Sequence, residues 1–378
     1  MTDFQPFLME RFMSMYEHDV EYNLSESGVH PVALGELLEE QPGALEALVA
    51  TPLNYPRVNG TPQLREHIAA LYAGAATQNV LVTVGAIEAN YNAIQALLSP
   101  GDEIVIMLPN YMQIWGIARN LGLGLKSFRL REERDWAPDL AELEEVVTSE
   151  TKLIAVCNPN NPTGAVLEAA EMDAIVGCAA RVGAWILADE VYSGAERLND
   201  EPTPSFYGRY DRVIAVGSLS KAYGLPGLRI GWVVAPKETV DAIWARHEYT
   251  TISATMLGNE LAAIALSSAT RARLLGRTRR YVRDGFRTLE EWLRTRGEVF
   301  RVVPPQAAAI AFLHYALDIN STELAERLRR QKSVLLVPGD HFGMDRFVRV
   351  SFGLPRDQLL AALERIAELI DELSLETR

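Results

Sequence analysis

Cysteine is scarce in this chain of 378 residues, which contains only Cys157 and Cys178. The two cysteines form no CxxC pair and lie near no cluster of histidines, so the sequence predicts neither a metal site nor a disulfide framework. We expect two buried free thiols in a cytoplasmic protein, because the reducing cytoplasm keeps cysteines free.

Long apolar runs and an excess of positive charge are missing as well. No stretch reaches the roughly 18 uninterrupted apolar residues that a membrane helix needs, and the acid-bearing N-terminus does not resemble a signal peptide. There are 36 lysine and arginine residues against 50 aspartate and glutamate residues, and the net charge is −14. Because an acidic surface repels phosphate backbones, we expect no nucleic-acid partner, and we expect no membrane partner either.

The length of the chain suits two domains, and predicted strands alternate regularly with predicted helices along it. Short apolar runs that read as buried strands are separated by amphipathic helical patterns. This order predicts crossover units and a mostly parallel sheet. The runs lie at residues 103–109, 151–159, 183–192 and 212–218.

The pattern changes near residue 270, where a long basic and apolar helical stretch begins. Short strand candidates at 308–315, 333–339 and 346–353 and a closing helix follow it, which indicates a smaller α+β domain.

We therefore predict an α/β fold with a large domain, built on a mostly parallel sheet flanked by helices, and a smaller C-terminal α+β domain. The predicted boundaries are 46–270 for the large domain, 271–378 for the small domain, and 1–45 for an N-terminal arm that forms part of the small domain.

Polar residues follow each of the four predicted strands at the point where the strand ends. These are Asn110-Tyr111, the Asn- and Pro-rich stretch 158–164, Asp189 to Tyr192, and Ser218 to Lys221. The carboxyl ends of parallel strands meet at one edge of a sheet, where ligands gather. The four clusters therefore predict one site.

Lys221 is unusual within this set. It stands in GSLSKAYGLPGLRIGW, a segment rich in glycine and apolar residues, although lysine is ordinarily a surface residue. Taken alone, the segment is either a surface loop or the setting of an amine that is kept for covalent chemistry.

The ordered set of motifs decides between these interpretations. The chain resembles fold-type I pyridoxal-phosphate enzymes of the aminotransferase class I/II family from about residue 51 to 353. The resemblance implies pyridoxal phosphate as cofactor, an amino acid and a 2-oxo acid as substrates, and a homodimer with a shared active site. The motifs are NYPRVNG, VGAIEA, PNY, NPNNPTG, DEVY, SLSKAYGLPGLRIG and FVRVSFG.

The resemblance also implies a role for each residue around the cofactor ring. Lys221 matches the lysine that forms the Schiff base and moves a proton at the substrate α-carbon. Asp189 matches the carboxylate that keeps the pyridine nitrogen protonated. Asn161 and Tyr192 match the residues that bind the phenolic oxygen, and Tyr111 matches the aromatic ring that stacks on the cofactor.

Other positions match the residues that hold the phosphate and the substrate. Many relatives have a hydroxyl residue at the helix that opens at Gly85, and this chain has Ala86 and Ile87 instead, so backbone amides must do more of the binding. Arg349 matches the arginine that takes the substrate α-carboxylate, beside Asn161, although an arginine in VRVSF could also lie on the surface. The implied phosphate ligands are Gly85, Ala86, Ile87, Ser218, Arg229 and Tyr55 of the neighbouring subunit.

Three functions remain open. The leading hypothesis is an aminotransferase for an L-amino acid and a 2-oxo acid. The second is a lyase, or an elimination and cyclisation enzyme, because NLSESGVHP resembles the N-terminal pattern of capreomycidine-synthase-like enzymes. There Glu26 is either a partner for a cationic substrate group or a solvated loop residue. The third, a regulator that binds the cofactor without turnover, is disfavoured because the N-terminal residues are acidic.

We predict that the cofactor is bound covalently by Lys221. Borohydride reduction followed by peptide mapping should find it joined permanently to the peptide that contains Lys221. Lys221→Ala should still bind pyridoxal phosphate, through Arg229, Ser218 and Asp189, but should no longer exchange the α-proton of an added amino acid. Mapping to any other lysine would contradict the assignment.

Overall fold

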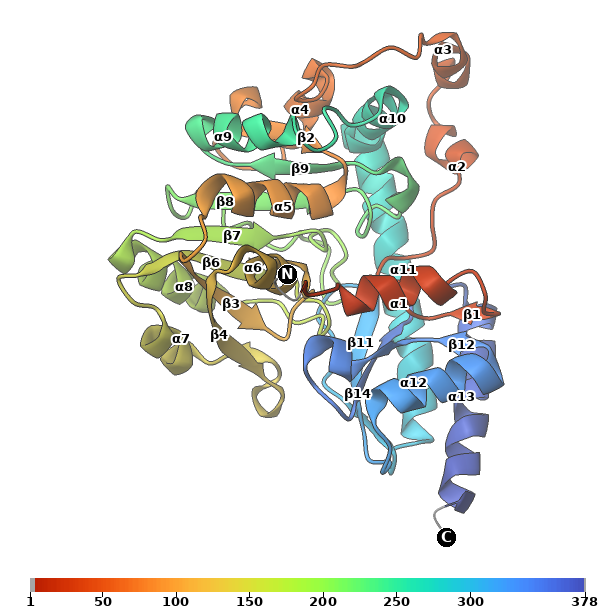
Figure 1. The fold of residues 1–378 in the computed structure, drawn as a ribbon. Coiled ribbons are helices and arrows are strands. Elements are labelled where there is room, and N and C mark those ends of the chain that lie inside the picture. The colour runs from red at the N-terminus through yellow and green to blue at the C-terminus, as the bar shows by residue number, and fades with distance from the viewer. Residues whose placement is uncertain (1–3, 377–378) are drawn as a thin grey trace.

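The computed structural model describes residues 4–376. Its main element is an eight-stranded sheet with the strand order β2-β9-β8-β7-β6-β3-β4-β5, shown in Figure 1. Strands β4, β3, β6, β7 and β8 are parallel to their neighbours in turn, while β9 runs antiparallel between β8 and β2, and β5 runs antiparallel to β4. The bounds are Val80–Thr83 for β2, Glu103–Leu108 for β3, Gly124–Arg131 for β4, Ala137–Pro138 for β5, Thr151–Cys157 for β6, Trp185–Asp189 for β7, Val213–Ser218 for β8 and Gly231–Val234 for β9.

Helices cover both faces of this sheet, because the buried strands carry apolar side chains on both sides. In β6, Leu153 and Ala155 pack in the core on one face, with α5, α6 and α9. Ile154 and Val156 pack in the core on the other face, with α7 and α8. The bounds are Pro62–Ala69 for α4, Gly85–Leu97 for α5, Gln113–Leu121 for α6, Leu140–Val146 for α7, Ala169–Val182 for α8, Lys237–His247 for α9 and Met256–Leu266 for α10.

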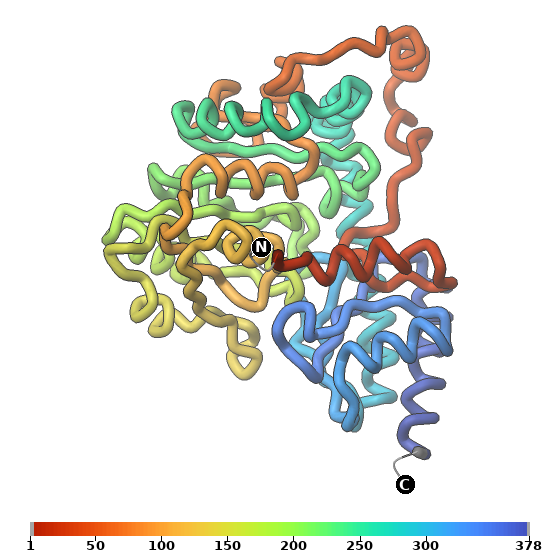
Figure 2. Tube along the Cα trace, in the orientation of Figure 1, coloured from red at the N-terminus to blue at the C-terminus, as the bar shows by residue number. Residues whose placement is uncertain are grey.

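A four-stranded antiparallel sheet with the order β10-β11-β14-β13 forms the small domain. The first part of the chain joins it, since β1 pairs in parallel with β12. Figure 2 shows the N-terminal helix α1 in red against the blue C-terminal part. The bounds are Leu8–Tyr16 for α1, Tyr22–Asn23 for β1, Phe300–Val302 for β10, Ile310–Tyr315 for β11, Ser321–Lys332 for α12, Val334–Leu335 for β12, Val337–Pro338 for β13, Phe347–Ser351 for β14 and Arg356–Glu376 for α13.

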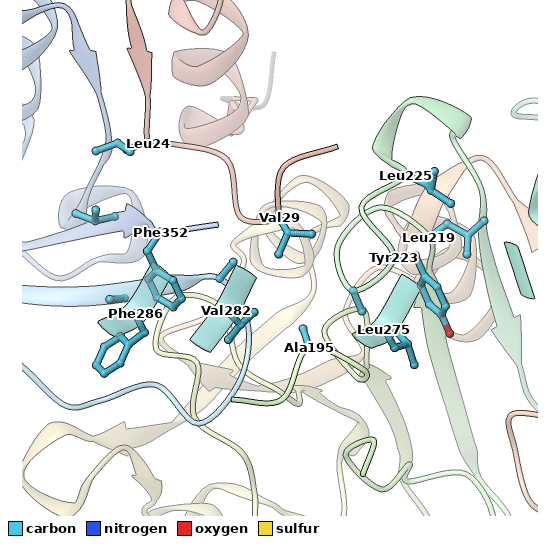
Figure 3. Packing of buried hydrophobic residues seen from close by; sticks show 14 of the residues in the cluster. Leu24, Val29, Ala195, Leu219, Tyr223, Leu225, Leu275, Val282, Phe286 and Phe352 are labelled. Carbon is cyan, nitrogen blue, oxygen red and sulfur yellow. The ribbon is translucent and has the colours of Figure 1, made fainter. Parts of the chain in front are cut away.

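A long helix, α11 (Ser268–Arg294), runs along both domains. Its Leu275 packs in the same core cluster as Tyr223, just beyond Lys221, while its Phe286 packs against Phe352 at the end of β14. Figure 3 shows these side chains along one continuous apolar cluster. The helix therefore ties the segment that carries Lys221 to the small domain.

Residues 34–61, which precede α4, form a segment that we call the arm; it is not the predicted N-terminal arm of residues 1–45. It contains α2 (Leu34–Leu38) and α3 (Ala44–Ala50), and α3 buries none of its residues. In Figure 1 the part that contains α3 stands away from the two domains, whereas α2 packs on α11, since Leu37 is buried and Glu36 pairs with Arg277 at 2.7 Å. Its large exposed apolar side chains are Leu34, Leu45, Val49, Leu53 and Tyr55.

The structure confirms the predicted α/β architecture, with helices on a mostly parallel sheet and a smaller α+β part. One detail differs, because the single strand expected at 333–339 is two short strands. β12 pairs with β1 and β13 pairs with β14, so two different partners divide the apolar run. Among residues 4–376, no helix is both long and apolar enough to cross a membrane.

Candidate active site

A cavity of about 290 Å³ lies at the carboxyl edge of the large sheet. Its walls come from the ends of β6, β7 and β8, the start of α5, helix α1 and the segment that follows β1. The parallel strands bring the predicted polar clusters together here, as expected. The predicted site residues that line it are Glu26, Ala86, Ile87, Tyr111, Asn161, Asp189, Tyr192, Ser218, Lys221, Arg229 and Arg349.

Lys221 lies just after β8, with its side chain 25 % exposed. Its Nζ is 3.8 Å from Oε2 of Glu26, which reaches the cavity from the N-terminal segment. Gly28 permits this approach, because a Cβ atom at that position would lie 3.2 Å from the carbonyl oxygen of Ser220. The N-terminal segment thus covers the lysine and supplies its nearest carboxylate.

Asp189 ends β7 and is buried, with 6 % of its surface exposed. Its Oδ2 accepts a hydrogen bond from Nδ2 of Asn90 at 3.0 Å, and its Oδ1 accepts one from the backbone of Val191 at 3.3 Å. Burial raises the pKa of Asp189, while these hydrogen bonds and the charge of Lys221 oppose the rise. A positively charged N–H in the cavity would stabilise the ionised form of this carboxylate.

The start of α5, Arg229 and two serines form a cationic end of the cavity. The guanidinium of Arg229 lies so close to Gly85 that a Cβ atom there would be 2.6 Å from Nη2, and Gly85 has a φ of 76°. Gly231 permits the same packing, since its Cβ would be 2.3 Å from the carbonyl carbon of Gly85. The Ser218 hydroxyl bonds that of Ser220 at 2.9 Å. These donors beside a helix N-terminus suit a phosphate.

Arg349 is the largest of the fully buried side chains, at 1 % exposed. Its Nη1 donates to Oδ1 of Asn161 at 2.9 Å, and its Nη2 donates to the carbonyl of Ser25. Sulfur atoms of Met9 and Met13 in α1 also contact it. Within residues 4–376 its Nε has no hydrogen-bond partner. Burial lowers the pKa of Arg349, and a carboxylate in the cavity would supply the missing acceptor and the counter-charge.

Two tyrosines complete the inner wall. The Tyr192 hydroxyl donates to the hydroxyl of Ser27 at 2.9 Å, and burial raises the pKa of Tyr192 above its ordinary value. The Tyr111 hydroxyl donates to Oε1 of Glu10 at 2.7 Å, so α1 is bonded to the ring that is expected to stack on the cofactor.

Two predicted residues lie outside the cavity lining. Gly85 lies directly behind it, against Arg229. Tyr55 is on the exposed arm, with 82 % of its surface accessible. It therefore takes no part in the cavity of its own chain.

Several cavity residues were not found from the sequence. Asn90 lies one turn after Ala86 on the same face of α5, and that i, i+4 spacing could have identified it. Ser220 flanks Lys221 in the SLSK motif. The others are Glu10, Met13 and Ser14 of α1 and Glu17 directly after it, which recur at the spacing of one helix face, together with Ser27, Gln113, Cys157, Val191 and Pro226.

The cavity has an acidic side made of Glu10, Glu17 and Glu26. Burial raises the pKa of Glu17, and the negative charges of Glu26 and Glu10 raise it further. Three carboxylates that repel one another therefore face the space between α1 and Lys221. A positively charged ligand group would relieve this repulsion.

The fold and these side chains define a pyridoxal-phosphate-dependent enzyme of fold type I. The family described as aminotransferase class I and II matches residues 38–366, and the chain belongs to this family. It is 32 % identical to capreomycidine synthase of Streptomyces vinaceus over 350 residues, which cover 92 % of this chain and 89 % of that relative.

Two solved structures are similar over nearly the whole chain. A PLP-dependent aminotransferase from Streptococcus suis has a TM-score of 0.92 and 31 % identity, over 98 % of this chain and 99 % of that one. The PLP-dependent cyclase OrfR has a TM-score of 0.88 and 29 % identity, over 97 % of both chains.

The cofactor of the family is pyridoxal phosphate, and the residues present fit it. The cationic end formed by α5 and Arg229 would hold the phosphate, the buried carboxylate of Asp189 would face the ring nitrogen, and Lys221 would reach the aldehyde. The unpartnered Nε of Arg349 leaves room for a substrate carboxylate beside them.

Arg349→Lys keeps a positive charge but loses the planar fork that can bind both carboxylate oxygens. We expect kcat/KM for amino acids to fall by roughly 100-fold or more. The visible absorption band of the resting holoenzyme should not change, because the substitution lies outside the phosphate and ring contacts. Unaltered kinetics would mean that another residue, for example Arg57, binds the carboxylate.

Proposed function

We propose that this protein is an aminotransferase for an L-α-amino acid that carries a positively charged side chain, with a 2-oxo acid as the second substrate. The observation that carries the proposal is the arrangement of charge in one cavity. The cation of Arg349, the amine of Lys221 and the carboxylates of Glu10, Glu17 and Glu26 line the same cavity.

The charged side chains that line the cavity would favour amino acids with a cationic side chain over those with an anionic one. An amino acid whose α-carboxylate binds Arg349 would direct its side chain toward Glu10, Glu17 and Glu26. Two unit charges about 5 Å apart interact by roughly 3 kcal/mol at an effective dielectric constant of 20. Glu26 is half exposed, with 50 % of its side chain accessible, so screening reduces its share to on the order of 1 kcal/mol. Even so, a cationic side chain would be favoured and a dicarboxylic one disfavoured.

Several residues in and beside the cavity would each have one task in this reaction. The bound cofactor supplies an electron-accepting ring for the bond broken at the α-carbon. Asp189, held by Asn90, would keep the ring nitrogen protonated. Lys221 would carry the proton to and from the α-carbon. Asn161 orients Arg349 through their hydrogen bond and so would orient the substrate.

A second candidate is an elimination and cyclisation on the same class of amino acid. Two similar proteins are named capreomycidine synthase and PLP-dependent cyclase, and the acidic side of the cavity gives a physical reason. In a transamination the 2-oxo acid must enter the same cavity, where the glutamates would repel a dicarboxylic acceptor. A cyclisation needs no such acceptor.

We also propose that the active form is a homodimer in the cytoplasm, in which Tyr55 of each chain reaches the phosphate of the other. The exposed apolar side chains of the arm, which include Val49 and Leu53, support a covered surface there. The two free buried cysteines fit a reducing compartment.

Tyr55→Phe removes only the hydroxyl of the arm tyrosine. We expect about a 10-fold weaker affinity for pyridoxal phosphate, the loss of one hydrogen bond to a charged group, and no change in the unfolding temperature of the apoprotein. Tyr249→Phe, at another highly exposed tyrosine, is the control and should bind normally. Sedimentation analysis that finds a monomeric holoenzyme at full activity would refute the shared site.

A spectral and product screen tests the substrate class. Holoenzyme mixed with each amino acid alone should be converted to its amine-loaded form fastest by arginine- or lysine-like compounds and slowest by aspartate and glutamate. Glu26→Gln should lower kcat/KM for cationic amino acids by about 10-fold and change that for alanine by less than about threefold, whereas Glu364→Gln on the exposed face of α13 should change neither.

The same screen separates the two reactions. An aminotransferase accumulates the amine form and releases a 2-oxo acid, whereas a cyclase regenerates the resting spectrum without any acceptor. A preference for aspartate or glutamate would disprove the cationic-substrate proposal.

A further inference from the structure

A buried ion pair lies directly behind the start of α5. Glu88, the residue after Ile87, is 7 % exposed, and His247, the last residue of α9, is fully buried. Nδ1 of His247 is 2.9 Å from Oε1 of Glu88. The pair therefore joins two helices on one face of the large sheet, outside the cavity lining, and the proposed chemistry makes no use of it.

The hydrogen bonds define the charge of both partners. Nε2 of His247 faces the carbonyl oxygen of Val58 at 3.3 Å, so both ring nitrogens face acceptors. A neutral imidazole carries only one N–H, and the ring must hold both protons to donate to both acceptors. Burial alone would raise the pKa of Glu88, but four hydrogen bonds, the first from His247, bring it down to about 2. Acceptors on both sides of the ring favour an imidazolium opposite a carboxylate.

The carboxylate is placed where it affects the helix N-terminus. Oε2 of Glu88 accepts the backbone N–H of Val84 at 2.6 Å, while the hydroxyl of Thr251 donates to Oε1 at 2.7 Å. The next three N–H groups, of Gly85, Ala86 and Ile87, belong to the first turn of α5, where N–H groups have no partner within the helix. Glu88 is the next residue of the same turn, about 1.5 Å beyond Ile87 along the helix axis. Its negative charge, left alone, would oppose any anion bound there.

We propose that His247 is a positioning residue for the cofactor, which cancels the charge of Glu88 so that the start of α5 remains attractive to the phosphate dianion. Glu88 fixes the turn at Val84 by accepting its N–H. His247 neutralises the negative charge of Glu88. The inference rests on the proposed phosphate site at α5 and Arg229. Two charges about 7 Å apart at an effective dielectric constant of 20 change an affinity by roughly 50-fold, so the countercharge is large enough to matter.

His247 also positions a second segment, through the contact of its Nε2 with the carbonyl oxygen of Val58. Val58 belongs to the segment NYPRVNG that carries Tyr55, and Asn59 of this segment accepts a hydrogen bond from the backbone of Val82 in β2. One imidazolium therefore holds the phosphate end of α5 and the segment of the arm tyrosine in a fixed relation.

The test compares pyridoxal phosphate with pyridoxal, which lacks the phosphate, in binding to the apoprotein. His247→Gln keeps a hydrogen-bond donor for Glu88 and removes the charge. We expect its dissociation constant for pyridoxal phosphate to rise by about 10-fold or more, while that for pyridoxal changes by less than about threefold. The double variant Glu88→Gln/His247→Gln should return the affinity for pyridoxal phosphate to within about threefold of the original.

A purely structural role predicts different results. It would weaken both ligands equally in His247→Gln, and it would make the double variant at least as weak as the single one; either result overturns the proposal. If His247→Gln does not fold, as thermal unfolding of the apoprotein would reveal, Glu88→Gln decides alone. It should not weaken pyridoxal phosphate, and a 10-fold loss would overturn the proposal.

Arg229→Gln distinguishes failure of this inference from failure of the proposed phosphate site. It should weaken pyridoxal phosphate and spare pyridoxal. If it does so while His247→Gln has no effect, only the role of His247 is wrong. If Arg229→Gln has no effect either, the phosphate lies elsewhere and both proposals fall.

Discussion

The buried guanidinium of Arg349 is the interaction on which the arrangement of the two domains depends. A charged group without water is costly unless acceptors surround it. Here they come from different parts of the chain: Asn161 from the turn that follows β6, the carbonyl of Ser25 from the N-terminal segment, and the sulfur atoms of Met9 and Met13 from α1. Satisfying one cation therefore closes the N-terminal helix over the cavity and joins it to both sheets.

A second constraint comes from the connection between β8 and β9. These strands are antiparallel neighbours, and Ser218 pairs with Gly231 at the point where the connection leaves the sheet. Lys221 and Arg229 both lie within this connection, so one closed loop carries the amine and the guanidinium that is proposed to bind the phosphate. The relative position of Lys221 and Arg229 is thereby constrained by backbone pairing within the large sheet.

The fold could be predicted because its strands are continuous apolar runs and its site residues follow them directly. Asp189, Ser218 and Lys221 were found in this way. Glu10 and Glu17 were not, because their role depends on where α1 crosses the cavity, which local pattern does not specify. The contact between Glu88 and His247 joins residues 159 positions apart, and although Glu88 lies in the VGAIEA motif, His247 stands neither at a strand end nor in a recognised motif. Local sequence therefore predicts the elements and the inner edge of the site, whereas tertiary packing sets its acidic side and its support.

The pairing of β1 with β12 has a consequence for how the protein is made. Tyr22 and Asn23 leave the ribosome early, but their partners Val334 and Leu335 are synthesised near the end. The strands of the large sheet lie between residues 80 and 234, so they can pair before the C-terminal part is synthesised. Domains generally fold as units during synthesis. The N-terminal segment must stay unpaired through most of translation, and Glu26, Ser27 and Gly28 can cover Lys221 stably only after it docks. The large sheet, which carries Asp189 and Ser218, can therefore fold first, and the N-terminal segment covers the cavity last.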